Sequence, residues 1–229
     1  MLDEAARITT EEGVEGLSAR RLSTAVNTST TAIYTLFGGM DGIRFALYRR
    51  AADSYYESMS ALKYDADNPL KFMDQVMLMY RRWALANPNL YNILFGGALK
   101  LDHSMPESHG GVPQSDLQFA ADLAKPPTQA VHRAIELGQL PIPDDRVPTF
   151  LISSWACMHG LVSVEINAAT NGIQSGLPGV SEAEFGEPLY VETIRSITRG
   201  LIQTYQLEHT TAEAATDRLN EFIKSDESF

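Results

Sequence analysis

Hydroxyl side chains crowd one short stretch, residues 29–35 (STTAIYT), which carries no charged residue. A hydroxyl can donate a hydrogen bond to a phosphate or to a base edge, and a threonine methyl group can contact the methyl group of thymine. Exposed threonines are also often no more than solvated surface residues, so the chemistry depends on the element that presents them. The candidate contacts to DNA are Ser18, Arg20, Ser29, Thr30, Thr31, Tyr34 and Thr35.

Two short helices joined by a tight turn are expected to present these residues. They can share one small core, because apolar residues recur at helical spacing at Leu17, Leu22, Val26, Ile33 and Phe37. Asn27 tolerates the left-handed backbone that often ends a helix, and Ser29 is a good N-cap for the second helix. This pattern is typical of a helix-turn-helix, whose second helix can enter a DNA major groove.

The rest of the chain is predicted to be helical throughout, with no convincing strand and no internal repeat. The expected helices are 2–12, 17–26, 30–36, 41–62, 69–86, 89–95, 114–137, 149–169, 188–205 and 211–224. We expect the helix at 114–137 to be disturbed at its two consecutive prolines. The fold class is therefore all-α, with an N-terminal three-helix helix-turn-helix domain (1–42) and a larger helical ligand-binding and dimerisation domain (43–229).

Composition favours a soluble cytoplasmic protein with no membrane partner. The chain has 229 residues, 44% of them hydrophobic, and a net charge of −11. Its single cysteine, Cys157, excludes an internal disulfide framework. The N-terminus carries acidic residues where a signal peptide has basic ones, and no uninterrupted apolar run reaches the roughly 18–20 residues of a spanning helix.

Nothing in the sequence indicates an enzyme, a metal site or a cofactor. The five histidines lack the spacing of metal ligands. No nucleophile elbow, phosphate-binding loop or pair of catalytic carboxylates appears, and Glu165 alone is not an active site. Cys157 is expected to pack as a small hydrophobe.

Methionine and aromatic residues could line a cavity for a small-molecule effector, since such side chains make adaptable apolar walls. At helical spacing they are more often plain core, and about a third of them are expected to touch a ligand. For His159, a satisfied core or interface histidine is the stronger alternative to a ligand contact. The candidates are Met73, Met77, Tyr80, Trp83, Tyr91, Phe95, Phe119, Trp155, Met158 and His159.

Two helices carry the pattern of a subunit interface. The segment 149–169 is apolar almost all round, and 188–205 has a narrow apolar stripe that suits packing against partner helices. The residues expected at a homodimer interface are Val162, Ile166, Tyr190, Ile194, Ile197, Leu201 and Tyr205.

The order of residues over the first fifty positions resembles the TetR family of transcriptional regulators. The match rests on Ala5-Ala6, Gly13, Ser18, Ser29 and the Tyr34-x-x-Phe37 ending. The second half resembles the ligand-binding domain called WHG within that family, through 80–84 (YRRWA), Asn87-Pro88, Tyr91 and 155–160 (WACMHG). The resemblance implies an all-α homodimer that binds palindromic operator DNA and is released from it by a small molecule.

The charge of the N-terminal 60 residues departs from that expectation. Six arginines face eight carboxylates, a net charge of −2, whereas a DNA-binding domain is usually basic. Met40 also stands where the family commonly has a phosphate-contacting lysine. Either a basic arm is encoded upstream of Met1, or binding is weak and relies on Arg20, Arg21 and hydroxyl donors. The competing hypothesis is an all-α small-molecule-binding protein or enzyme with weakened DNA binding.

Overall fold

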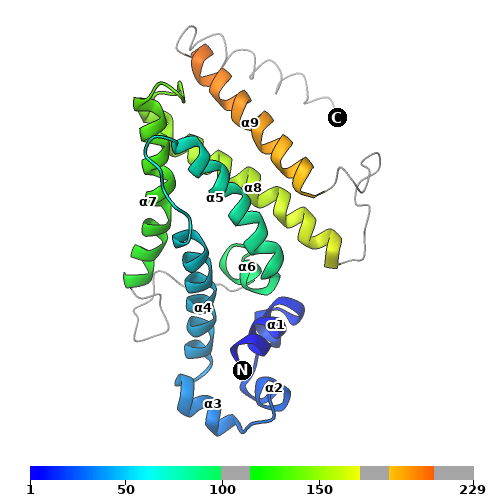
Figure 1. Cartoon of the computed structure of the whole chain (residues 1–229). Coiled ribbons are helices and arrows are strands. Elements are labelled where there is room, and N and C mark those ends of the chain that lie inside the picture. Colours follow the sequence, from blue (N-terminus) through cyan, green and yellow to red (C-terminus); the bar gives the residue numbers. More distant parts are fainter. Residues whose placement is uncertain (99–113, 171–185, 209–229) are drawn as a thin grey trace.

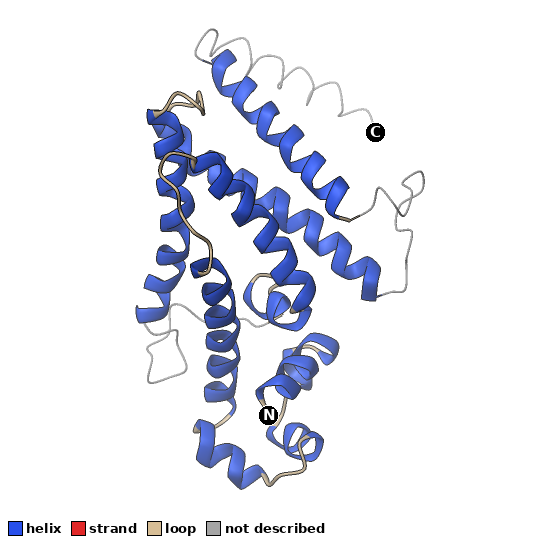
Figure 2. Ribbon diagram, in the orientation of Figure 1, coloured by secondary structure: helices blue, strands red, loops and turns tan. Residues whose placement is uncertain are grey.

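In the computed structural model, the described part of the chain comprises residues 1–98, 114–170 and 186–208, without the side chains of 114–121, 207 and 208. All regular elements in these ranges are helices (Figure 2). The predicted loop at 101–113, most of the crossing at 171–187 and the predicted helix at 211–224 lie outside the described residues.

The all-α fold predicted from the sequence is confirmed, and so is each predicted helix within the described ranges (Figure 1). The α-helices are α1 Leu2–Glu12, α2 Ala19–Ala25, α3 Thr30–Phe37, α4 Met40–Ser60, α5 Pro69–Ala86, α6 Pro88–Leu94, α7 Gln114–Glu136, α8 Val147–Thr170 and α9 Glu187–Glu208. Short 3₁₀ turns lie at Val14–Gly16 and Asp144–Arg146. The helix α7 continues through Pro126 and Pro127, where a disturbance was expected.

The first three helices form a small head that has its own core. Its fully buried side chains include Ile8, Leu22 and Ile33, one from each helix. Between α2 and α3, Asn27 adopts a φ of 52°, the left-handed conformation that its residue type predicts. The Ser29 side chain then caps α3 by accepting a hydrogen bond from the backbone N–H of Ala32 at 3.1 Å.

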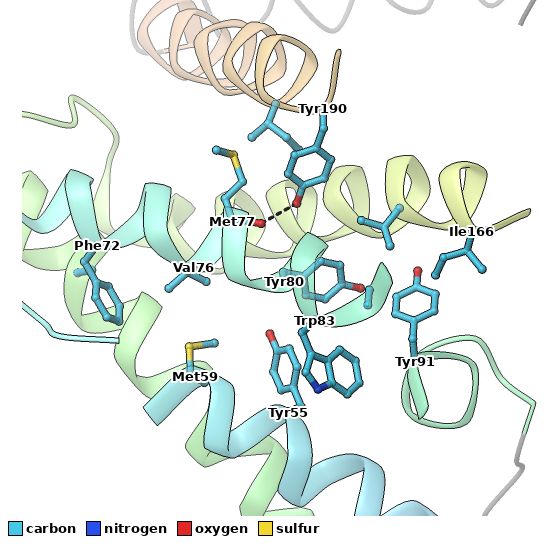
Figure 3. Packing of buried hydrophobic residues seen from close by; sticks show 14 residues of the cluster. Tyr55, Met59, Phe72, Val76, Met77, Tyr80, Trp83, Tyr91, Ile166 and Tyr190 are labelled. Carbon is cyan, nitrogen blue, oxygen red and sulfur yellow. Dashed lines mark hydrogen bonds between the residues drawn. The ribbon is translucent and has the colours of Figure 1, made fainter. Parts of the chain in front are cut away.

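The larger bundle packs α5, α7, α8 and α9 around a core rich in tyrosine (Figure 3). Tyr80, Tyr91 and Tyr190 are its largest fully buried side chains. Each buried phenol needs a hydrogen-bond partner, and the Tyr190 hydroxyl donates to the backbone oxygen of Met77 at 3.0 Å. This bond ties α9 to α5.

Two helices belong to both halves of the molecule. The helix α4 buries Ile43 and Leu47 in the head core, and Tyr55 and Met59 in the core of the larger bundle. The short α6 packs against both α1 and α4. The predicted boundary between residues 42 and 43 falls inside α4, so the two halves are joined by a helix that is continuous across it.

Candidate functional site

The second helix of the helix-turn-helix presents an exposed, uncharged, hydroxyl-rich face. Tyr34 is 55% exposed, and Thr30, Thr31 and Thr35 are exposed as well. The Thr35 hydroxyl donates to the backbone oxygen of Thr31 at 2.9 Å, which leaves its oxygen free to accept from a base or a bound water. Leu36 adds an apolar side chain to the exposed part of the same helix, since 66% of it is exposed.

The other three predicted contacts lie at the edges of the helices. Ser18 caps α2 by accepting from the backbone N–H of Arg21 at 3.2 Å, as Ser29 caps α3. Arg20 is exposed in the first turn of α2. All seven residues predicted to contact DNA are therefore exposed.

Carboxylates pair with almost every arginine of residues 1–60, which here count as the head together with α4, and charge counting alone cannot reveal this. Arg21 bonds Glu12 at 2.6 Å, and the hydrogen bond from this arginine holds the pKa of Glu12 below its ordinary value. The other ion pairs are Arg7–Glu4, Arg7–Glu11, Arg44–Asp41, Arg49–Asp53 and Arg50–Asp3. Among the described residues, Arg20 is the one head arginine for which no carboxylate partner is seen.

A cavity of about 610 Å³ opens in the larger bundle, within the range of small-molecule sites. It is walled by α4, α5, α7 and α8 and by Phe95, which follows α6. Its lining residues are Tyr55, Met59, Met73, Val76, Phe95, Leu123, Ala124, Pro127, Thr128, His132, Asp144, Val147, Pro148, Leu151, Ile152, Ser154, Trp155 and Met158.

Four of the predicted effector contacts line this cavity: Met73, Phe95, Trp155 and Met158. Five others pack elsewhere in the core or bond across it, namely Met77, Tyr80, Trp83, Tyr91 and His159. Phe119 lies in α7, but its side chain is outside the described residues. Identical residue types therefore serve as core and as cavity wall, and only packing separates them.

Most of the cavity wall was not anticipated. Tyr55 and Met59 stand on the apolar stripe of α4, which the sequence does show, but a stripe does not reveal whether it meets a core or a void. The contributions of α7, including Thr128 and His132, carry no chemical signal in the sequence at all. They come together because α7 packs along α5 and α8.

His159 contacts three aromatic residues, namely Trp155, Tyr91 and Tyr80. Its ring stacks on Trp155 and on Tyr91, with centroids 5.2 and 5.5 Å apart. Its Nδ1 lies 2.8 Å from the Tyr91 hydroxyl and 3.2 Å from that of Tyr80. Burial lowers the pKa of His159, so the neutral ring predominates at physiological pH. His159 is thus a half-buried histidine with hydrogen-bond partners, and it does not line the cavity.

A buried ion pair fixes α5 to α8 beside this cluster. Arg81 donates two hydrogen bonds to Glu165, at 2.7 and 2.8 Å, and both side chains are about nine-tenths covered. Arg81 also reaches Glu187 at the start of α9. The hydrogen bonds to Glu165 raise the pKa of Arg81 above its ordinary value. Glu165 thus has a structural role, as the partner of Arg81 in an ion pair between two helices.

The residues expected at a dimer interface divide into two groups. Val162, Ile166, Tyr190, Ile194 and Tyr205 are buried inside their own protomer, where α8 and α9 pack on each other and on the core. Leu201 is partly buried, whereas Ile197 is 39% exposed. A partner chain could reach only this second group without unfolding the protomer.

Comparisons with known proteins agree with this architecture. Residues 73–178, which include most of the cavity wall, match the family model described as "Tetracyclin repressor-like, C-terminal domain". This match places the C-terminal domain of the chain in the TetR family. In that family the preceding helices are a DNA-binding head, the place that the helix-turn-helix occupies here. The WHG subtype predicted from 155–160 stays a prediction.

Solved structures share the fold of this TetR-family chain at low sequence identity. A TetR family transcriptional regulator, PfmR from Thermus thermophilus, is 18% identical, with a TM-score of 0.57 over 85% of this chain and 96% of that one. A protein of unknown function from a Rhodococcus species is 17% identical, with a TM-score of 0.55 over 89% and 92% of the two chains. No curated protein matches the sequence.

Proposed function

We propose that this TetR-family protein is a DNA-binding transcriptional regulator, a repressor whose operator complex is released when a small molecule enters the cavity. One observation carries the proposal: the helix α4 that begins beside the recognition helix α3 ends in the cavity wall. Its Ile43 and Leu47 hold the head core, and its Tyr55 and Met59 line the cavity. The resemblance of the fold to PfmR, a transcriptional regulator, supports the same conclusion.

The recognition helix α3 would read the major groove through Thr30, Thr31, Tyr34 and Thr35. Ser18, Arg20 and Ser29 would contact phosphates, which position the head without reading sequence. Gel-shift titration against the DNA upstream of the protein's own coding sequence tests this. Tyr34→Phe should weaken the complex about three- to tenfold, because it removes one hydrogen bond and little else. Tyr56→Phe, at an exposed tyrosine of α4, is the matched control.

A ligand in the cavity can act on the head through both shared helices. It would push on Tyr55 and Met59 of α4, and on Phe95, which directly follows α6. A helix is stiff over its 21 residues, so a small tilt at one end of α4 moves α3 at the other. Release requires that the ligand bind the tilted state better than the DNA-bound state. Trp155→Ala should therefore blunt the response to effector while leaving operator binding intact.

A homodimer would place two heads on successive major grooves, about 34 Å apart on one side of the duplex. We assign this contact to one surface of the protomer, here called the uncharged surface. It consists of the exposed residues Thr149, Ile152, Ala156, Gly160 and Val164 of α8 and Ile197, Gly200 and Thr204 of α9. In a chain of net charge −11, an exposed face without charges favours contact with a second copy.

Two glycines strengthen this assignment. A Cβ atom added to Gly160 or to Gly200 would meet nothing within 4 Å in the protomer, so no contact inside the chain requires glycine there. Small residues let helices of a partner approach closely. By length and composition alone, Asp144–Thr170 could also cross a membrane, but α8 packs against α5, α7 and α9 in this bundle. We assign its exposed apolar side to the partner chain.

The paired arginines favour a second candidate function, a small-molecule-binding protein whose DNA affinity is weak. Each ion pair in the head must be broken or shared before its arginine can neutralise a phosphate. The gel-shift experiment separates the two. A complex with the upstream DNA that forms at submicromolar protein and responds to Tyr34→Phe supports the regulator. Binding that is equally weak to unrelated DNA supports the alternative.

A further inference from the structure

The cavity is lined almost entirely by apolar atoms, and its few polar residues are unevenly placed. Five lining residues carry a polar side-chain atom other than sulfur or the indole nitrogen: Tyr55, Thr128, His132, Asp144 and Ser154. No lysine or arginine is among the described residues of the wall. A carboxylate or phosphate group of a ligand would find no positive partner in this wall.

The two titratable rim groups pair with each other. The Asp144 side chain is 79% exposed and that of His132 is 46% exposed, and their Oδ1 and Nδ1 atoms lie 3.5 Å apart. Both are hydrated at the mouth of the cavity. Deeper in, the wall is formed by side chains such as Val76, Phe95 and Trp155, with no carboxylate to stabilise a cation. A charged ligand group would therefore lose its hydration and gain no counter-charge.

Two hydroxyl groups of the wall make no hydrogen bond to the described residues. The Ser154 hydroxyl is buried and makes no hydrogen bond. The Tyr55 side chain is 6% exposed, and within the described residues its hydroxyl also makes none. Figure 3 shows the Tyr55 phenol between Met59 and Trp83, directed toward α5. A buried hydroxyl without a partner, as at Ser154, is unusual in proteins, and a ligand that accepts hydrogen bonds would give both hydroxyls a partner.

We propose that the cavity binds an uncharged, mainly apolar molecule that carries a hydroxyl or carbonyl oxygen, and that Tyr55 and Ser154 donate to this oxygen. The inference rests on the proposed function, because it names the chemical class of the effector. Tyr55 has a particular place in it. Burial raises its pKa, so the phenol stays a donor, and it stands on the helix that leads to the head. Recognition of the ligand oxygen is thus made by α4 itself.

Three probes of equal chain length test the class: dodecanol, dodecanoate and dodecylammonium. Binding to the full-length protein is followed by calorimetry and by quenching of Trp155 fluorescence in a Trp83→Phe background. Dodecanol should bind at least about tenfold more tightly than either charged probe. Tyr55→Phe and Ser154→Ala should each weaken dodecanol binding several-fold, whereas Tyr56→Phe should not. A preference for a charged probe, equal binding of all three, or no binding of dodecanol would overturn the proposal.

The same titrations in the presence of operator DNA keep this inference apart from the proposed function. If dodecanol binds as expected and the DNA complex is unaffected, the ligand class stands and the regulatory function fails. If a charged probe binds and releases the DNA, the regulatory function stands and the ligand class is wrong.

Discussion

Tyr91 and Ile93 lie two positions apart on α6 and are buried in different cores. Tyr91 packs into the larger bundle, where its hydroxyl meets His159 at 2.8 Å, and Ile93 packs into the head beside the residues of α1 and α4. One short helix therefore spans both halves. Because α6 is followed at once by Phe95 of the cavity wall, we expect the state of the cavity to influence the position of the head.

Removing the head-side contact of α6 should loosen the head and leave the cavity intact. Ile93 is 2% exposed, so Ile93→Ala should lower the free energy of unfolding by about 2–4 kcal/mol. It should also weaken operator binding, with dodecanol affinity unchanged within a factor of two or so. Urea denaturation, gel shifts and calorimetry measure the three quantities. Leu70→Ala, at an exposed position of α5, is the control. Operator affinity equal to that of the wild type would refute the linkage through α6.

Freeing one arginine of the head should strengthen DNA binding. Glu12→Gln releases Arg21 from its ion pair, and we expect a gain of about two- to fivefold, since an exposed pair is worth up to about 1 kcal/mol. The dependence of log K on log salt should steepen by about one unit. Glu57→Gln changes the net charge equally at the far end of α4. If both variants gain alike, the effect is one of overall charge and not of Arg21.

A bulky residue at Gly160 distinguishes a dimer from a monomer. Gly160→Leu fills open space in the protomer and improves helix propensity, so an isolated chain should gain roughly 0.5–1 kcal/mol of stability. In the proposed dimer the same side chain would collide with the partner. Sedimentation velocity should show dissociation into folded monomers. Ala169→Leu, exposed on α8 outside the uncharged surface, should leave the association state unchanged. A dimer that persists in Gly160→Leu places the interface elsewhere.

The neutral His159 should make stability depend on pH in a defined window. Burial lowers the pKa of His159 in the folded chain, so the unfolded chain takes up the proton more readily. Stability is unaffected above the ordinary value of 6.5, falls as the pH drops through it, and levels off below the folded pKa. His159→Gln should flatten this part of the curve of melting temperature against pH. An unchanged slope in His159→Gln would contradict the prediction.

Sequence periodicity was sufficient for the helices because it depends on local forces. The caps at Ser18 and Ser29, the left-handed Asn27 and the proline that starts α5 act within a few residues, and each lies where its residue type predicts. The hydroxyl face of α3 followed for the same reason. A helix that buries Ile33 must expose Thr31 and Tyr34, since one face excludes the other.

Tertiary packing decided everything that depends on which helices meet. Met77 and Met73 are four residues apart on α5, yet the first is core beside α9 and the second lines the cavity. Tyr190 and Ile197 share an apolar stripe, but only Ile197 remains exposed for a partner. Arg21 and Arg50 are counted in the sequence, whereas their pairing with Glu12 and Asp3 requires contacts between helices. Hydrophobicity predicts that a residue is buried, but it does not predict whether the core, a ligand or a partner chain covers it.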